Sequence, residues 1–216
     1  MTVPFRAPEQ VAAAIPLVRS HLQAGGLLGY PTETVYGLGS PATELGVQRL
    51  VQLKGRRPGK PFLLLVSDRA MVQRLGLVLT RAATTLADMF WPGPLTLVLA
   101  GAEDRLPDLL RGPEGGIAVR WTAHAGMARL IGALGEPLTS TSANRPGGPT
   151  AAGSTMLEQE FREAVTAGTL LVLDGGPLGN VPPSTVVDCT GPVPRLVREG
   201  AIPRAELRRR AASHAP

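Results

Sequence analysis

Apolar stretches of two kinds alternate along this chain, and their pattern predicts its secondary structure. Apolar residues that recur every three or four positions are typical of helices, whereas short apolar runs bounded by Gly and Pro are typical of buried strands. The pattern predicts helices over 8–24, 43–54, 67–75, 80–90, 124–134 and 156–168, and a short basic helix from 203. It predicts strands over 27–31, 61–66, 95–100, 116–121, 137–143, 170–174, 184–189 and 195–199.

Helices and strands interleave without a change of composition, a linker or an internal repeat. This order predicts a single α/β domain, built on a twisted open sheet with flanking helices. Hairpin-length gaps between the last strands indicate that the sheet is mixed, and strands that are apolar throughout indicate helices on both faces of part of it. Thr43 and Ser67 are the predicted N-caps of their helices. The helix after Thr43 is expected to bury Leu45, Leu50 and Val51.

The composition is that of a loop-rich globular protein. Of 216 residues 44% are hydrophobic, which disfavours disorder, and Gly (26) with Pro (21) makes up nearly twice the usual share of about 12%. The single cysteine, Cys189, excludes a disulfide framework and a cysteine-cluster metal site. The apolar runs are too short to span a membrane, and the N-terminus does not resemble a secretory signal. We therefore expect a cytoplasmic protein.

The charge balance points to an anionic partner. The net charge is +5 and the pI about 10.3, values that favour a nucleotide or RNA as partner. Of the 22 Lys and Arg residues only Lys54 and Lys60 are lysines, and both lie in the segment KGRRPGK, which has four cations in seven residues. Such a density of charge predicts a phosphate chain as the ligand. A solvated basic loop is the alternative.

The common catalytic motifs are absent from the sequence. It contains no GxxxxGK[ST] loop, no GxGxxG after a strand, no GxSxG and no HExxH. His21, His124 and His214 lie on separate segments, which disfavours a histidine-based triad, and we expect them to be solvated. Asp174 and Asp188 end predicted strands, where each is expected to cap a turn rather than to bind a metal ion.

Polar loops follow several of the predicted strands, which is where ligands bind on open α/β sheets. These segments are PTETVYGLG (31–39), TSTSAN (139–144) and the pair Ser184-Thr185. Arg120 ends an apolar strand, and Arg198 lies in LVREG. Each of these arginines needs a carboxylate or phosphate partner, for which Glu199 or Asp188 is the internal alternative to a ligand.

Seven segments in this order carry a resemblance to a known family: PTETVYGLG, KGRRPGKP, WPGPLT, a strand ending VR, TSAN, DGG followed by PSTVVD, and LVREGAI. Together they resemble the YrdC-like family, the threonylcarbamoyl-AMP synthases. The resemblance implies a domain over 1–207, followed by a basic tail over 208–216, with a large positively charged cavity. It also implies an enzyme that condenses L-threonine, bicarbonate or CO2 and ATP into threonylcarbamoyl-AMP and pyrophosphate, for the modification of adenosine 37 in tRNA.

The resemblance assigns roles to individual residues. Those implied to contact L-threonine are Thr32, Arg120, Ser140 and Ser184. Those implied to bind ATP are Lys54, Arg56, Lys60, Gly116, Ser142, Asn144, Thr150 and Arg198, and of these Lys54 and Arg56 are the predicted catalytic residues. Mg²⁺ would arrive with ATP, and proteins that transfer the threonylcarbamoyl group to tRNA would receive the product. Leu65 stands where many relatives have a histidine, and Thr122 replaces a common proline.

Two other interpretations stay open. An RNA-binding module without catalysis would use the basic balance and the arginine-rich tail to bind tRNA or double-stranded RNA, although the few aromatic residues disfavour base stacking. A carbamoyl-transfer domain of a hydrogenase-maturation protein is the third interpretation, which the lack of zinc-finger-like cysteines disfavours. The missing triad is compatible with the synthase, because transfer at a phosphate depends on positioning and charge neutralisation.

Overall fold

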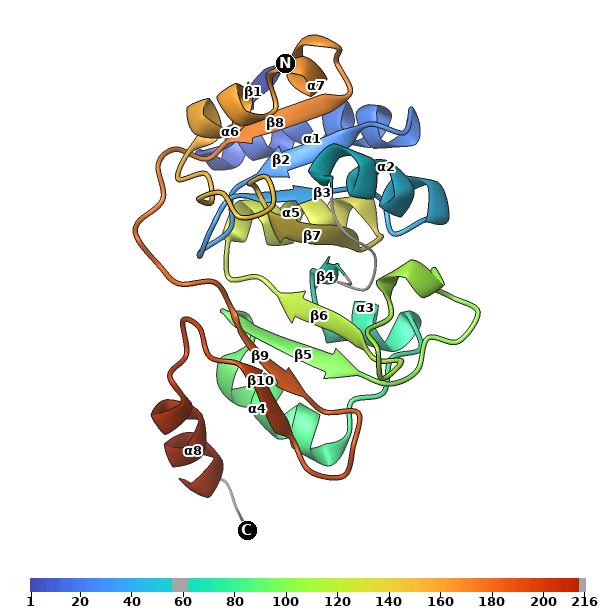
Figure 1. The fold of residues 1–216 in the computed structure, drawn as a ribbon, viewed down its shortest axis with the longest axis vertical. Coiled ribbons are helices and arrows are strands. Elements are labelled where there is room, and N and C mark those ends of the chain that lie inside the picture. The colour runs from blue at the N-terminus through green and yellow to red at the C-terminus, as the bar shows by residue number, and fades with distance from the viewer. Residues whose placement is uncertain (56–61, 214–216) are drawn as a thin grey trace.

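Ten strands form one mixed sheet in the computed structural model, which describes residues 1–55 and 62–213 (Figure 1). The strands are β1 (Thr2–Pro4), β2 (Leu27–Tyr30), β3 (Gly37–Gly39), β4 (Leu63–Val66), β5 (Leu95–Leu99), β6 (Ile117–Trp121), β7 (Leu138–Ser142), β8 (Leu170–Asp174), β9 (Thr185–Asp188) and β10 (Arg195–Arg198). Their order is β1-β8-β2-β3-β7-β4-β6-β5-β9-β10. The sheet contains both parallel pairs, such as β4 with β6, and antiparallel pairs, such as β9 with β10, so the predicted mixed α/β sheet is confirmed.

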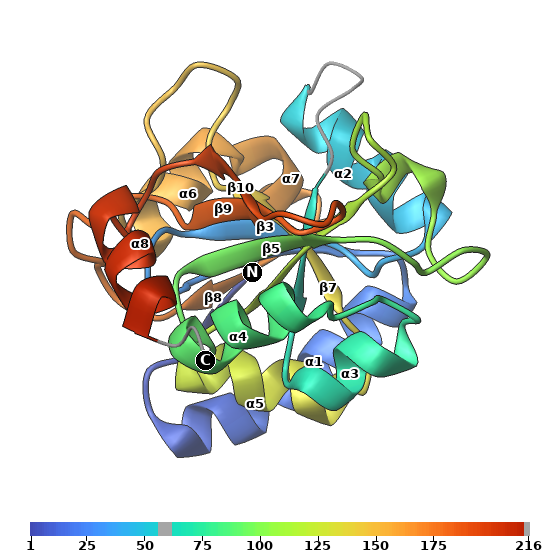
Figure 2. The ribbon, with the colours of Figure 1, turned by 90° about the horizontal axis from the view of Figure 1, so that it is seen from below.

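Helices cover both faces of the sheet, as predicted. They are α1 (Pro8–Gln23), α2 (Glu44–Lys54), α3 (Arg69–Arg74), α4 (Arg81–Phe90), α5 (Ala125–Leu134), α6 (Ser154–Glu160), α7 (Arg162–Thr166) and α8 (Arg204–Ser213), with a short 3₁₀ helix η1 (Asp108–Leu110). In Figure 2 α1, α3, α4 and α5 lie below the sheet, whereas α2, α6 and α7 lie above it. Within residues 1–55 and 62–213, no helix is long and apolar enough to cross a membrane.

The strands in the middle of the sheet have two distinct faces, because successive side chains on a strand point in opposite directions. Leu64, Leu97 and Val119 are neighbours in the strand register and are fully buried. They belong to the core. The alternate positions, such as Val98 and Ala118, line a cavity on the opposite face. The two-residue period of the strands therefore separates the core from the face that carries the cavity.

Helix α2 begins and ends as its sequence predicts, but it buries a different set of side chains. Thr43 is the N-cap, and its hydroxyl accepts a hydrogen bond from the backbone N–H of Gly46. The buried face includes Val47, Leu50 and Lys54, spaced by three and four residues, whereas Leu45 is 55% exposed. The prediction that Leu45 is buried is wrong. The actual rotation of the helix turns Lys54 inward at the last turn, where it is 5% exposed.

Two predicted helices differ in detail from the structure. The segment 156–168 contains two helices rather than one, because the chain breaks at the buried Phe161, whose φ is −118° and ψ is 33°. The N-cap of α3 is Asp68 and not Ser67. The Asp68 carboxylate accepts from the backbone N–H of Met71 at 2.7 Å, while the Ser67 hydroxyl donates to the same carboxylate. A carboxylate at this position also interacts favourably with the partial positive charge of the helix N-terminus.

Strand β3 was not predicted, because PTETVYGLG has the composition of a loop. It pairs antiparallel with both β2 and β7. A Cβ atom at Gly39 would lie 2.1 Å from the carbonyl oxygen of Thr139, so β3 approaches its neighbour too closely for any other residue. The glycines that suggested a turn are therefore needed for the packing of a central strand. The short strand β1 was also missed.

Candidate functional site

A cavity of about 620 Å³ lies over the centre of the sheet, on the face opposite to the one that carries Leu64, Leu97 and Val119. Eight of the predicted site residues line it: Thr32, Gly116, Arg120, Ser140, Ser142, Thr150, Ser184 and Arg198. All four residues predicted for L-threonine and four of the eight predicted for ATP therefore meet in one cavity. Its lining includes three arginines and two acidic residues, and the predicted positive charge of the cavity stays a prediction.

The strand register explains how residues distant in sequence come together here. Paired residues in neighbouring strands point to the same face of a sheet. Gly37 is opposite Ser142, Val98 is opposite both Ala118 and Asp188, and all of them line the cavity. The floor is thus built from alternate positions of the central strands and of β9. Leu65, which is level with Arg120 in the register, is fully buried, so an apolar side chain stands beside this arginine.

Arg120 is the buried cation of this cavity, with a side chain that is only 4% exposed. Its Nη2 atom lies 2.7 Å from the carboxylate of Glu33, and both terminal nitrogens donate to the hydroxyl of Thr34 at 3.1 Å. Nε donates to the carbonyl oxygen of Gly93 at 3.2 Å. Because its carboxylate partner comes from the loop after β2, the expectation that Glu199 or Asp188 pairs with Arg120 is wrong.

The carboxylate of Glu33 is held at both of its oxygens. Oε2 accepts from the hydroxyl of Thr122 at 2.5 Å, and Oε1 accepts from the backbone N–H of Ala123 at 3.1 Å. Burial by itself raises the pKa of Glu33, but the charge of Arg120 and the hydrogen bonds from Thr122, Arg120 and Ala123 outweigh it and leave the pKa below its ordinary value of 4.5. Glu33 is therefore ionised at neutral pH, and it forms a largely buried ion pair with Arg120.

Thr32, a predicted L-threonine contact, folds its own loop. Its hydroxyl donates to the carbonyl oxygen of Val35 at 2.7 Å and accepts from the backbone N–H groups of Thr34 and Val35 at 3.2 Å. The same hydroxyl lies 3.1 Å from that of Thr34, the residue that contacts Arg120. The loop after β2 is thus an ordered wall of the cavity. Ser140, also predicted for L-threonine, is opposite Leu63 in the register and lines the same cavity.

On another side of the cavity Ser184 contacts Arg198. The guanidinium of Arg198 donates to the carbonyl oxygen of Ser184 from Nη2 at 2.7 Å and from Nε at 3.2 Å. The expectation that Glu199 or Asp188 pairs with Arg198 is wrong as well. The hydroxyl of Ser184 lies 2.8 Å from that of Thr96. Partial desolvation of this otherwise exposed side chain, together with the charge of Arg120, lowers the pKa of Arg198. Two cations that face one cavity favour an anionic ligand.

Lys54 donates hydrogen bonds to the TSAN segment (141–144). Its ammonium donates to the carbonyl oxygen of Ser142 at 2.7 Å, to the side-chain oxygen of Asn144 at 2.9 Å, and to the backbone oxygen of Asn144. The hydroxyl of Ser142 donates to the same side-chain oxygen of Asn144. Neither Lys54 nor Asn144 lines the cavity. Both of them contact Ser142, which does line it. Arg56 and Lys60, the other predicted phosphate ligands, lie outside the described residues.

The acidic side chains that line the cavity are paired with an arginine that sequence reasoning missed. Arg195 lies 3.0 Å from Asp188 and 2.8 Å from Glu114, and all three line the cavity. Asp188 also accepts from the backbone N–H of Thr190, and Asp174 from that of Gly176, so the prediction that these aspartates cap turns is confirmed. In the described part of the chain there is no cluster of three or more His, Cys, Asp or Glu residues suited to a metal ion.

Two of the three histidines have structural contacts, contrary to expectation. His124 is half-buried and caps α5, with Nδ1 accepting from the backbone N–H of Met127. His21 is half-buried, and its Nε2 lies 2.9 Å from the carbonyl oxygen of Leu27. Neither histidine lines the cavity. His214 lies outside the described residues.

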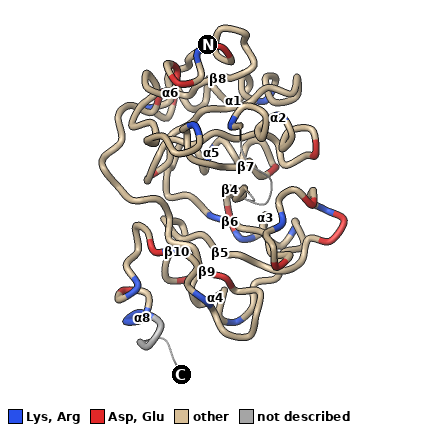
Figure 3. The backbone as a smooth tube through the Cα atoms, in the orientation of Figure 1, with Lys and Arg blue, Asp and Glu red and all other residues tan. Residues whose placement is uncertain are grey.

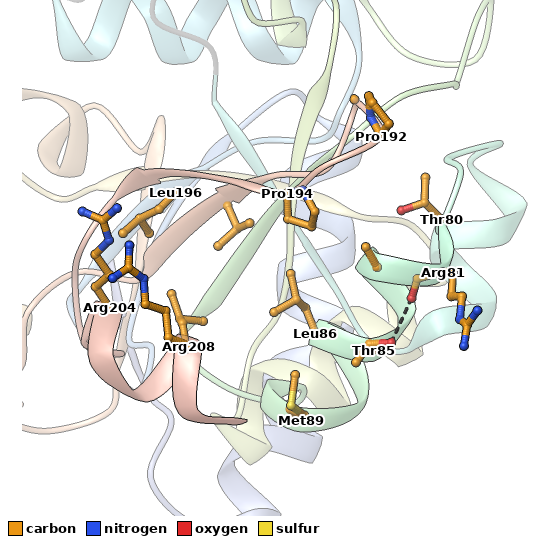
Figure 4. A pocket seen from close by; sticks show the side chains of 14 residues that line it. Thr80, Arg81, Thr85, Leu86, Met89, Pro192, Pro194, Leu196, Arg204 and Arg208 are labelled. Carbon is orange, nitrogen blue, oxygen red and sulfur yellow. Dashed lines mark hydrogen bonds between the residues drawn. The ribbon is translucent and has the colours of Figure 1, made fainter. Parts of the chain in front are cut away.

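A second hollow, of about 860 Å³, lies between α4, β10 and α8 (Figure 4). Leu86 and Met89 of α4 face Leu196 of β10, and Arg204 and Arg208 of α8 lie at its edge. It contains none of the predicted site residues. The predicted polar site residues converge in the cavity over the sheet and not in this hollow. The cavity over the sheet, although the smaller of the two, is therefore the candidate site.

Known proteins resemble this chain in sequence and in fold. A family model for Sua5/YciO/YrdC proteins, described as "Telomere recombination", matches residues 20–200. A threonylcarbamoyl-AMP synthase from Nitrosococcus oceani is 40% identical over 141 residues, which cover 65% of this chain and 76% of that protein. Another from Thiobacillus denitrificans is 36% identical, covering 87% of this chain and 97% of that protein.

Among solved structures, the crystal structure of Pyrococcus abyssi Sua5 complexed with L-threonine is similar over almost the whole chain. It is 30% identical with a TM-score of 0.86, and the match covers 97% of this chain and 60% of that one. The chain thus spans nearly all of one relative but only about three fifths of another.

Proposed function

The chain belongs to the Sua5/YciO/YrdC family, and from this membership and the geometry of the cavity we propose that it is a threonylcarbamoyl-AMP synthase. Its substrates would be L-threonine, bicarbonate or CO2, and ATP, and its products threonylcarbamoyl-AMP and pyrophosphate. The observation that carries the proposal is that eight residues implied to bind L-threonine and ATP line one cavity. By reaction type the enzyme would be a nucleotidyltransferase.

The cavity offers complementary groups for both substrates. Arg120 would bind the carboxylate of L-threonine, with the hydroxyls of Thr32, Ser140 and Ser184 close by as partners for its other polar groups. Arg198 would neutralise part of the charge of ATP. We also propose that Ser142, Asn144, Thr150 and Gly116 contact the nucleotide, and that Lys54, Arg56 and Lys60 act near its phosphates.

The reaction that we propose needs no protein nucleophile. The neutral amine of L-threonine would attack CO2, with release of one proton to solvent, or bicarbonate, with loss of water, to give a carbamate. A carbamate oxygen would then form a bond to the α-phosphorus of ATP as the bond to pyrophosphate breaks. The contribution of the chain is to hold the two reactants in line and to neutralise charge, which by itself accounts for a large share of such rate enhancements. The lack of a catalytic triad is consistent with this chemistry.

Mg²⁺ stays a prediction, and no step above depends on it. The two acidic side chains that line the cavity, Asp188 and Glu114, are engaged by Arg195, so this donor set does not suit a protein-held metal ion. In the proposal Mg²⁺ would be bound by the phosphates of ATP, which are themselves good ligands for it. The proteins that transfer the product to tRNA and a cytoplasmic location belong to the same proposal.

Pyrophosphate release tests the proposal directly. With ATP present, release should require both L-threonine and bicarbonate, and omission of either should abolish it. The competing interpretation is an RNA-binding module, which would use basic surfaces such as the arginine-rich helix α8 (Figure 3). Tight binding of tRNA at moderate salt, with no L-threonine-dependent release of pyrophosphate, would refute the enzyme and favour the module.

A further inference from the structure

Glu33 contacts the central arginine of the cavity, yet no substrate contact is assigned to it. We infer that Glu33 is a positioning residue for L-threonine, whose carboxylate fixes the guanidinium of Arg120 in the orientation that binds the amino acid. The inference rests on the proposed function, because it concerns the substrate proposed for this cavity. It is supported by two sets of contacts: those that fix the guanidinium of Arg120 and those that fix the carboxylate of Glu33.

The protein fixes the guanidinium of Arg120 from three directions. Glu33 binds Nη2, Thr34 accepts from both Nη1 and Nη2, and the carbonyl oxygen of Gly93 accepts from Nε. A guanidinium has five N–H groups in a rigid plane. One N–H group of Nη1 is left without a protein acceptor among the described residues. Since Arg120 lines the cavity, this N–H group is available to a carboxylate of the substrate.

Glu33 is itself too constrained to act as a ligand or a base. Its two oxygens accept from Thr122 and Ala123, which directly follow β6, the strand that carries Arg120. The carboxylate therefore ties the loop after β2 to the end of β6. Because its oxygens are engaged by three protein donors, its effect on a substrate must pass through Arg120.

An amide in place of the carboxylate would break this arrangement without changing its size. Glutamine has only one acceptor oxygen, whereas Glu33 uses two, and its NH2 group would face either Thr122 or the guanidinium, both of which donate. Arg120 would lose one of its three anchors and the opposite charge that compensates its burial. The residues proposed to bind ATP, such as Ser142 and Arg198, do not contact Glu33. The defect should therefore be specific to L-threonine.

Steady-state pyrophosphate release by the full chain tests this inference. L-threonine is titrated at saturating ATP and bicarbonate, and ATP is then titrated at saturating L-threonine. For Glu33→Gln we expect the KM for L-threonine to rise at least 10-fold, with the KM for ATP within 2-fold and kcat within 3-fold of the unmodified protein. Thr122→Val, which removes one donor to Glu33, should raise the KM for L-threonine about 3-fold. Glu206→Gln breaks a partly exposed Glu–Arg pair on α8 and is the matched control, expected to change none of these values.

The outcomes separate the inference from the function on which it rests. No L-threonine-dependent release by the unmodified protein would refute the proposed function. If that protein is active and Glu33→Gln leaves the KM for L-threonine unchanged, only the positioning role is refuted. A fall in kcat with unchanged KM values would also refute it, since mere loss of folded enzyme has that signature. If Glu33→Gln does not fold, Thr122→Val decides: an unchanged KM for L-threonine in that variant would refute the positioning role.

Discussion

Lys54 should be required for tight binding of ATP, even though its ammonium is bound to the protein. The perturbation is Lys54→Met, which keeps the length of the side chain and the helix propensity but removes the charge. In the folded protein this ammonium donates to Ser142 at 2.7 Å and to the side chain of Asn144 at 2.9 Å. Loss of one hydrogen bond from a charged donor costs about 1.5–3 kcal/mol. The ammonium makes at least three such bonds, but its removal also removes the cost of burying a charge, so we expect the free energy of unfolding to fall by about the value of one bond.

The effect on ATP follows from the position of these acceptors. Ser142 lines the cavity and shares Asn144 with Lys54, so the TSAN segment would move when the cation is removed. We expect ATP binding to weaken by about 1–3 kcal/mol, which corresponds to a rise in Kd of about 5-fold to about 150-fold. Calorimetric titration with ATP measures it, and thermal unfolding checks that the variant is folded. Arg49→Met, on the same helix but bound to Gly25 outside the cavity, is the control. A folded Lys54→Met variant whose Kd for ATP stays within 2-fold of the unmodified protein would refute the reasoning.

Three further predictions concern single side chains. Ser184→Ala removes a hydroxyl and with it a long 3.4 Å contact of Arg198, but it keeps the carbonyl oxygen that accepts from Arg198 at 2.7 Å and 3.2 Å. L-threonine should therefore bind about 2-fold to about 10-fold more weakly in calorimetry, while the affinity for ATP stays within about 2-fold. Equal L-threonine affinity would exclude Ser184 from the site. The lowered pKa of Glu33 contributes stability that is complete well above pH 4.5 and is lost as the pH falls below that value. The difference in free energy of unfolding between the unmodified protein and Glu33→Gln, measured with urea, should therefore narrow between pH 6 and pH 3. A constant difference would contradict the assignment. Burial, with the charge of Asp188, raises the pKa of the Cys189 thiol to about 12. A disulfide reagent at pH 8 should therefore label Cys189 only after denaturation. Rapid labelling of the native protein would show that the thiol is accessible.

Much of the candidate site could be predicted because its chemistry is local in sequence. Thr32, Ser140, Ser142 and Ser184 each lie in a polar segment next to an apolar strand, and all of them line the cavity. Glu33 lies in one of these segments and could have been found there, since a carboxylate next to a predicted ligand loop is a natural partner for a buried arginine. Arg195 gave no such signal, because its relation to Asp188 depends on the pairing of β9 with β10.

The amino-acid sequence alone determined the helices, most of the strands, the mixed α/β class and the family. These features depend on hydrophobic periodicity, on capping residues such as Thr43 and on ordered segments of polar residues, all of which act over a few positions. Tertiary structure decided which charges meet. The partner of Arg120 is 87 residues away at Glu33, and Lys54 reaches Ser142 because α2 buries the face that carries it. Strand register and helix rotation are set by packing across the whole sheet, so no local pattern contains them.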